Sequence, residues 1–193
     1  MPSSYTPLGV QLMNTGEKSG TWGTLTNTNW DIIEQIAGGY LEIDIAGGAQ
    51  TTDLSVADGT SGDTNQVAHR VIKFTGTITG AQIVTIPLDV QQSYLILNGT
   101  SGGYTVQLKY ITGSGSSVTW TTTKKDWKVI YASADDATNP DIVEVPLGMT
   151  DIVDDTTPQL GGNLDIQSYG LTSSTNIMNS TISSTGKALI LGF

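Results

Sequence analysis

The hydrophobic and polar positions of the chain predict one helix, followed by a long series of short strands. In the opening segment, residues 1–41, apolar residues recur at helical spacing at Leu25, Ile32, Ile33, Ile36 and Ala37. Two glycines follow this run, and glycine commonly ends a helix. The pattern predicts a helix over residues 24–37. Because helices under about 12–15 residues are marginal in water, its apolar face should pack on another part of the protein.

Residues 42–147 have the pattern of short strands separated by turn residues. Residues 104–110 alternate strictly between apolar and polar side chains, as a half-buried strand does. Asn98-Gly99 and Ser101-Gly102-Gly103 predict a hairpin between two of the strands. The predicted strands are 42–46, 51–56, 69–75, 82–86, 93–98, 104–111, 117–122, 127–132 and 142–145. The sequence therefore predicts a mainly β fold, an antiparallel β-sandwich that resembles a jelly roll.

Residues 148–193 differ from both preceding segments. A turn-rich linker is followed by a tail of Ser, Thr and Asn in which large apolar residues are scattered without a helical period, Leu164, Ile166, Leu171, Ile177 and Ile182 among them. A segment this short with so little to bury cannot hold its own fold without a metal, disulfides or partner chains. We therefore expect partner chains to order this tail, and a disordered tail is the alternative.

Composition and charge narrow the possible partners. Only 37% of the residues are apolar and 13% are charged, which favours strands and turns over long helices. The net charge of −10 would repel a phosphate backbone, so we expect no nucleic-acid partner. The chain has no cysteine, and its N-terminus has neither the basic start nor the apolar core of a signal peptide. Nor does any apolar run reach the roughly 18 residues of a membrane span, so we expect no membrane insertion.

The sequence offers little material for catalysis. We interpret the one histidine, His69, as a half-exposed strand residue, and the Gly-rich stretch 113–116 as a turn, because no P-loop lysine follows it. The segment 58–63 lacks the ligand spacing of a known calcium loop. We interpret the carboxylates as turn-forming, solvated residues: Asp53, Asp58, Asp63, Asp135, Asp136, Asp154 and Asp155. We therefore expect no catalytic residue, metal or cofactor, and a protein that is not an enzyme.

The four tryptophans are the largest possible anchors of a core or an interface. Trp120 and Trp127 lie in predicted strands, and we expect both in the core. Trp22 lies ahead of the predicted helix, where a small segment offers little to bury it. Burial at a subunit interface and burial within its own segment are both open for this residue. We assign Trp22 and Trp30 as candidate docking side chains, since aromatic residues often dominate interfaces.

Three stretches together resemble the tail-fibre-like and virion structural proteins of tailed bacteriophages, especially those of marine and cyanobacterial hosts. Residues 15–23 (TGEKSGTWG) with 26–29 (TNTN) are similar to the N-terminal attachment stretch of such proteins. Residues 154–165 (DDTTPQLGGNLD) are similar to a segment that precedes repetitive shaft regions. Residues 184–193 (STGKALILGF) resemble a family C-terminus, so we expect a complete chain.

The resemblance implies a homotrimer on the virion, assembled in the host cytoplasm, with the N-terminal segment docked to tail, adaptor or portal-proximal proteins. In such a trimer, the scattered apolar residues of the tail would meet their equivalents around the axis: Leu164, Ile166, Leu171, Ile177 and Ile182. The short stretch after the linker leaves no room for a long shaft. We therefore expect a short tail fibre, a fibre base or an adaptor. The alternatives are a capsid decoration or head-fibre protein, and a module that binds host-surface glycans through loops 58–66 or 113–117.

Overall fold

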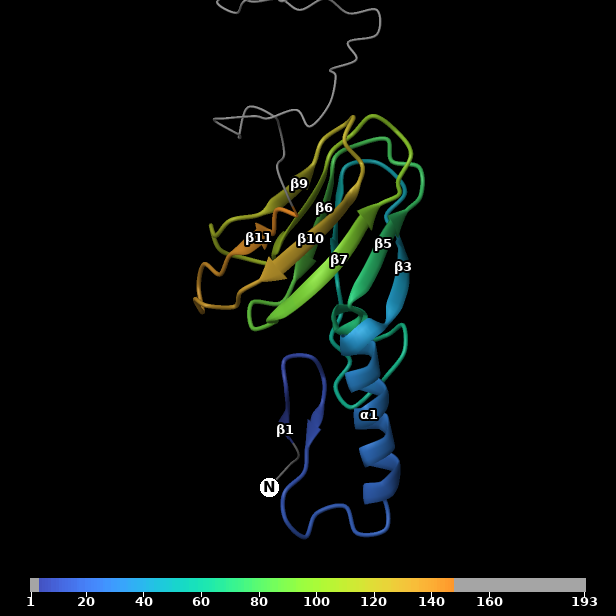
Figure 1. The fold of residues 1–193 in the computed structure, drawn as a ribbon, viewed down its shortest axis with the longest axis vertical. Helices are drawn as coiled ribbons and strands as arrows, with labels where there is room; N and C mark the ends of the chain where they lie inside the picture. The colour runs from blue at the N-terminus through green and yellow to red at the C-terminus, as the bar shows by residue number, and fades with distance from the viewer. Residues whose placement is uncertain (1–3, 148–193) are drawn as a thin grey trace, which may run out of the picture. The chain divides into compact units, whose positions relative to one another are not determined.

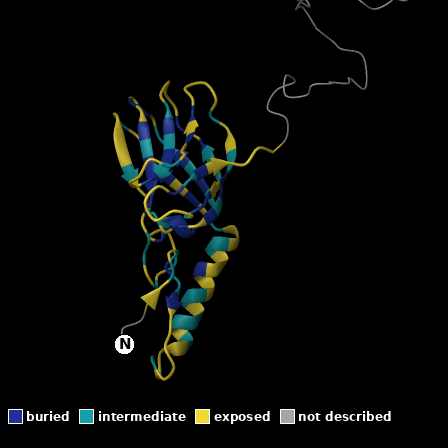
Figure 2. Ribbon diagram, turned by 90° about the vertical axis from the view of Figure 1, so that its left-hand side faces the viewer, coloured by how far each residue is buried: buried dark blue, intermediate teal, exposed yellow. Residues whose placement is uncertain are grey.

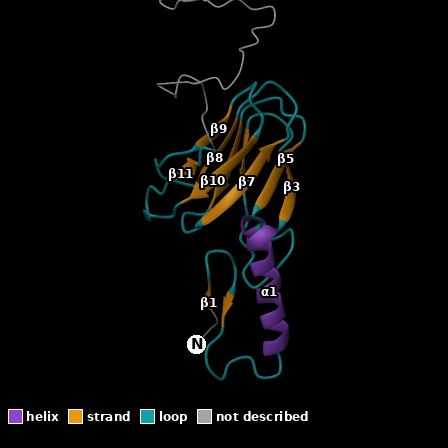
Figure 3. Ribbon diagram, in the orientation of Figure 1, coloured by secondary structure: helices purple, strands orange, loops and turns teal. Residues whose placement is uncertain are grey.

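The computed structural model describes residues 4–147, and every expectation for residues 148–193 lies outside this range. The described chain is mainly β, with one α-helix and three sheets (Figures 1 and 3). A small hairpin and the helix come first, as β1 (Ser4–Tyr5), β2 (Gln11–Leu12) and α1 (Trp22–Gly38). The following elements are β3 (Tyr40–Asp44), β4 (Gln50–Asp53), the 3-10 turn η1 (Gln66–Ala68), β5 (Val71–Thr75), β6 (Gln82–Ile86), β7 (Gln92–Asn98), β8 (Val106–Tyr110), β9 (Val118–Trp120), β10 (Trp127–Ala132) and β11 (Ile142–Glu144).

The predicted elements are confirmed within the described residues. The helix begins two residues earlier than expected, at Trp22, and each of the nine predicted strands overlaps one of β3–β11. The strands also bury alternate residues, without exception in β3, β5, β7 and β8. This agreement has a simple cause, because a strand with one face on a core must alternate apolar and polar side chains.

The strands form two larger sheets, and the chain moves from one to the other at each step from β3 to β8. The five-stranded sheet has the order β11-β10-β7-β5-β3, and the four-stranded sheet has the order β4-β6-β8-β9. Strands β3, β5 and β7 are parallel neighbours in the first sheet, as β4, β6 and β8 are in the second. The chain therefore winds through three turns of a coil, and each turn consists of one strand from the five-stranded sheet and one strand from the four-stranded sheet.

The prediction of antiparallel pairing is wrong for these six strands. Within the described residues, antiparallel neighbours occur in the small β1–β2 hairpin and where β9, β10 and β11 join the coil. This arrangement also differs from a jelly roll, in which neighbouring strands are antiparallel. The period-2 pattern shows which side chains face the core, but it does not show which strand lies alongside.

The predicted hairpin after β7 is also wrong. Asn98-Gly99 and Ser101-Gly102-Gly103 connect β7 to β8, which belongs to the opposite sheet, so they form a corner of the coil. The turn residues were identified correctly, because glycine is needed there. A two-sheet coil simply uses the same residue types to cross between sheets that a hairpin uses to reverse within one.

The three corners that follow β3, β5 and β7 stack directly on each other through backbone hydrogen bonds. The amide of Gly47 donates to Thr77 O, and the amide of Ile78 donates to Ser101 O, both at 3.0 Å. This close approach leaves no room for side chains at several glycines. A Cβ on Gly102, where φ is +100°, would lie 2.1 Å from Ile78 O, and one on Gly80 would lie 2.2 Å from Ala49 N.

Two polar side chains bind the corner carbonyls that the stacking leaves over. The buried Gln82 donates through Nε2 to the carbonyls of Gly48 and Gly80, and more weakly to Gly47 O, which also accepts from the amide of Thr79. At the last corner, the Lys125 ammonium donates to the carbonyls of Thr100 and Gly102. These bonds matter because a buried carbonyl without a partner is costly.

One hydrophobic core lies between the two larger sheets. Side chains at equivalent positions of successive turns lie beside each other, such as Leu41, Ile72 and Ile96. Phe74 of the first sheet meets Trp120 of the second edge to face, with ring centroids 5.9 Å apart. The core therefore connects the coil to the antiparallel strands that follow it.

The corner stacking predicts that alanine destabilises the protein at one of two adjacent glycines and not at the other. Gly102→Ala places a Cβ against the backbone of the preceding turn in a left-handed conformation, so it should lower the free energy of unfolding by about 2–3 kcal/mol. Gly103→Ala meets nothing within 4 Å and should change it by less than about 0.5 kcal/mol. Urea unfolding of the two variants measures the difference. Equal effects would mean that the corners do not stack in this way.

Candidate docking surface on the N-terminal helix

Helix α1 leads directly into β3, the first strand of the coil, and the small β1–β2 hairpin lies beside it (Figure 3). The helix ends where Gly38 and Gly39 allow the chain to turn. The amide of Gly39 donates to Gln35 O at 2.8 Å, and a Cβ on Gly39 would lie 2.7 Å from the Cα of Gln35. Glycine at this position therefore sets the direction in which the helix leaves the sheets.

The apolar residues of α1 form two faces, where the sequence predicted one. Ile32 is fully buried and is the one buried residue of the helix, while Leu25 and Ile36 beside it are half-buried. Ile33 and Ala37, predicted on the same face, are exposed. At about 100° per residue, they lie on the neighbouring side of the helix, together with Trp22 and Trp30. Figure 2 shows how much of the helix surface is exposed.

The second face of α1 is a row of exposed apolar side chains. Trp22 is 64% exposed and Trp30 is 63% exposed, although both are large rings. Ile33 and Ala37 extend the row toward the C-terminal end of the helix. We call Trp22, Trp30, Ile33 and Ala37 the apolar row. Large exposed aromatic side chains on one face of an element commonly mark interaction surfaces.

The hairpin is attached to the helix by a single amide side chain. Asn29 accepts a hydrogen bond from the Gln11 amide through Oδ1 and donates to Gln11 O through Nδ2, both at 2.9 Å. This is the pair of bonds that a neighbouring strand would make. The hairpin thus covers the buried side of α1 and leaves the apolar row open.

A buried polar network fixes the other end of the helix to the coil. Asn65 is completely buried in the loop between β4 and β5, and its Nδ2 donates to Leu8 O at 2.9 Å. The His69 ring contacts Asn65 O through Nδ1 at 3.1 Å and Gln35 Nε2 through Nε2 at 2.8 Å. Since a carbonyl only accepts, the Nδ1 of His69 carries the proton and its Nε2 accepts from Gln35. The ring therefore links the helix to the loop through both of its nitrogens.

His69 is thus not the half-exposed strand residue that the sequence predicted. It is only 3% exposed and lies just before β5, at the end of the loop of residues 54–70, where its ring contacts Gln35 of the helix. The prediction was wrong because the loop folds back over the ring, and no periodic pattern reveals where a loop lies. Gln35 and Asn65 were missed for the same reason.

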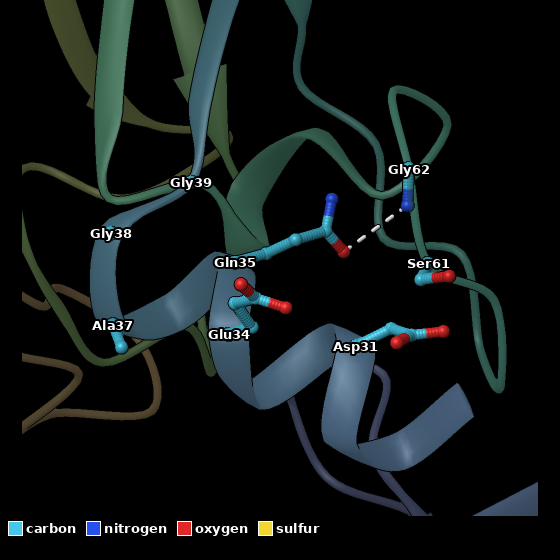
Figure 4. A pocket seen from close by; sticks show the side chains of 8 residues that line it. All are labelled: Asp31, Glu34, Gln35, Ala37, Gly38, Gly39, Ser61 and Gly62. Atoms are coloured by element: carbon cyan, nitrogen blue, oxygen red, sulfur yellow. Dashed lines mark hydrogen bonds between the residues drawn. The ribbon is translucent and has the colours of Figure 1, made fainter. Parts of the chain in front are cut away.

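An open pocket of about 670 Å³ lies beside the C-terminal half of α1 (Figure 4). The helix contributes Asp31, Glu34 and Gln35, and the loop contributes Ser61 and Gly62. Gln35 Oε1 accepts a hydrogen bond from the amide of Gly62 at 3.1 Å, which ties the two walls together. Neither carboxylate forms an ion pair with a described residue. The pocket therefore has a negative lining next to the apolar row.

The remaining tryptophans lie in the sheets. Trp120 is fully buried, which confirms the prediction for that residue. Trp127 is 48% exposed, so its assignment to the core is wrong. In β10 the buried residues are Ile130 and Ala132, and Trp127 has the opposite parity. Alternation along the strand therefore directs it outward.

The segments 58–63 and 113–116 lie in loops and turns of the described chain. No group of three His, Asp or Glu side chains between residues 4 and 147 could hold a metal ion. Asp58 and Asp63 are exposed. In the stretch 113–116, the amides of Ser114 and Ser116 already donate to Asn139 and Asp141, so they are not available to a phosphate. The pair Asp154 and Asp155 and the five predicted trimer contacts lie outside the described residues.

Comparisons with family models, with curated proteins and with solved structures give no match for this chain. In the part of the chain that the structure describes, no helix is long and apolar enough to cross a membrane.

Truncation of a side chain to alanine should affect stability very differently at two nearby residues of α1. Ile32→Ala removes a fully buried side chain and should lower the free energy of unfolding by about 2–5 kcal/mol. Trp30→Ala removes a larger side chain from an exposed position and should change it by less than about 0.5 kcal/mol. Denaturant unfolding of the isolated protein distinguishes them, and a large loss for Trp30→Ala would place that ring in a core.

Proposed function

We propose that the protein is a non-enzymatic structural component of a bacteriophage particle, a short tail fibre, fibre base or adaptor, that docks to the virion through α1. The observation that carries the proposal is the exposure of Trp22 and Trp30 on one face of a helix whose other face is held by the protein itself. The resemblance of residues 15–23 and 26–29 to phage attachment segments supports the same role.

A fixed helix is a favourable docking element. Binding costs conformational entropy when a segment must first become ordered, and a segment that is already held avoids this cost. Asn29 and Gln11 hold the middle of α1, while Gln35 and His69 hold its C-terminal end. Trp22 and Trp30 therefore lie on a helix that is already ordered before a partner binds. Indole rings are also among the side chains that most often dominate binding energy.

The exposed edge of the coil is less suited to association than the helix. An open edge strand can pair with another chain through its free backbone groups. At the first corner, Asp44 Oδ1 already accepts from the amide of Ala46, and Gln50 Nε2 donates to Ala46 O. Along β3, the Lys73 ammonium binds Glu42 and lowers the pKa of that carboxyl below its ordinary value. These polar and charged groups disfavour the addition of another strand at this edge.

In this proposal, three copies assemble through residues 148–193, where Leu164, Ile166, Leu171, Ile177 and Ile182 would meet around the axis. The two sheets of residues 40–147 then form the body of each subunit. The division of roles follows from composition, because the coil has its own core and the tail has too few apolar residues to form one.

The test of the docking role is incorporation into particles. Trp22→Ala and Trp30→Ala should reduce the amount of the protein in purified virions severalfold, because truncated anchor residues cost binding energy. Their melting temperatures should remain nearly unchanged. Trp127→Ala is the matched control, since it removes an exposed ring from the sheet, and it should leave incorporation unchanged. Normal incorporation of both helix variants would contradict the proposal.

The assembly role of the tail has a separate test. Deletion of residues 149–193 should convert an oligomer into a monomer while the coil stays folded, because the core lies within residues 41–142. Light scattering measures the mass, and circular dichroism shows whether the strands remain. A truncated protein that is still a trimer would place the trimer contacts outside the tail.

A further inference from the structure

We propose that the apolar row of α1 binds an amphipathic helical segment of a partner protein, and that this segment places a Lys or Arg side chain in the pocket beside the helix. This inference rests on the proposed docking role, and it names the chemistry of the partner. Two independent features of the described residues carry it, the apolar row and the negative pocket.

The apolar row has the dimensions of a helix-binding surface. Its four members span most of α1, from its first residue to within one residue of its end. Helical segments that dock on such surfaces use apolar side chains spaced by three or four residues, which form a matching row. A helix also satisfies its own backbone hydrogen bonds, so it can cover Trp22 and Trp30 without leaving amides unpaired.

The electrostatics of the adjoining surface select the charge of that segment. The helix sequence contains Asp31 and Glu34 but no Lys or Arg. Both carboxylates line the pocket with Ala37, which also belongs to the apolar row, so the two surfaces are continuous (Figure 4). The C-terminal end of a helix carries partial negative charge, and the last turn of α1 has no basic side chain to offset it. A cation at this point would be favoured by both effects.

The same charges argue against two other occupants of this face. An anionic lipid surface would be repelled by Asp31 and Glu34, whereas surface-binding helices usually have Lys or Arg beside their apolar face. A second α1 in parallel would place the carboxylates of one helix near those of the other, without any basic residue of either helix to pair with them. A basic amphipathic segment avoids both problems.

The test uses two synthetic helical peptides with the same Leu/Ala face, one carrying Lys and the other Glu beside that face. The Lys peptide should bind the full chain and shift the fluorescence of Trp22 and Trp30 to shorter wavelength, because the rings leave water. The Glu peptide should bind at least about tenfold more weakly, as two surface ion pairs are replaced by like charges. Equal binding of the two peptides would overturn the inference.

Substitutions of Asp31 and Glu34 test whether the Lys side chain of the peptide binds in the pocket. Asp31→Asn with Glu34→Gln should weaken binding of the Lys peptide by about tenfold and leave the Glu peptide little changed or slightly tighter. Glu34→Gln alone should give part of this loss. Asp126→Asn is the matched single-charge control, because Asp126 is exposed but lies outside the helix. It precedes β10, whose first residue pairs with Leu97 near the end of β7. If Asp126→Asn weakened binding of the Lys peptide as much as Glu34→Gln does, the attraction would be a nonspecific one to an acidic protein, and the inference would be overturned.

Particle incorporation separates this inference from the docking role. If Trp22→Ala and Trp30→Ala reduce incorporation but Asp31→Asn with Glu34→Gln does not, the docking role stands and the basic partner is wrong. If the tryptophan variants incorporate normally, the docking role itself fails. Binding of the protein to phosphatidylcholine vesicles with the same fluorescence shift, and without a preference between the peptides, would identify the face as a lipid contact.

Discussion

The fold depends on the close stacking of the three corners, after β3, β5 and β7, where the chain crosses from the five-stranded to the four-stranded sheet. Each corner lies within hydrogen-bonding distance of the next, so its backbone must approach another backbone without side chains between them. Gly80 and Gly102 meet this requirement, and Gln82 binds the carbonyls that the stacking leaves unpaired. The register of the corners then aligns β3 with β5 and β7, and β4 with β6 and β8. The continuous core between the sheets follows from that alignment.

The coil also determines how the helix is placed. The first turn of the coil is longer than the second because residues 54–70 leave the sheet and return before β5. This loop contains the buried Asn65 and, near its end, His69, which contacts Gln35 of the helix. The same loop supplies one wall of the pocket through Ser61 and Gly62. One extension of the coil therefore supports the helix and shapes the surface beside it.

The sequence predicted the elements well and their arrangement poorly, and the difference has a physical cause. Alternation identified the nine strands because it reports the side of a strand that faces the core. It carries no information on the neighbouring strand, so parallel pairing was missed. A repeated Gly-Ala-Gln, at residues 48–50 and 80–82, marks equivalent positions in two turns of the coil and would have revealed the repeat.

For the candidate site, the sequence identified the tryptophans but not their setting. Trp22 was open to two interpretations, and its exposure argues against burial among the described residues of its own segment. The acidic pocket and the His69 network bring together residues far apart in the chain, which no local pattern encodes. Trp127 could have been placed by its parity with Ile130 and Ala132.

The attachment of the hairpin through Asn29 has a consequence for how this protein can change over evolutionary time. Asn29 binds the backbone of Gln11, and a backbone amide and carbonyl are present whichever residue occupies that position, except for proline. Substitutions of the hairpin side chains therefore leave these two bonds intact, whereas substitution of Asn29 would remove them. Selection on a new binding partner could act on the exposed surface of this region without loosening the helix that presents it.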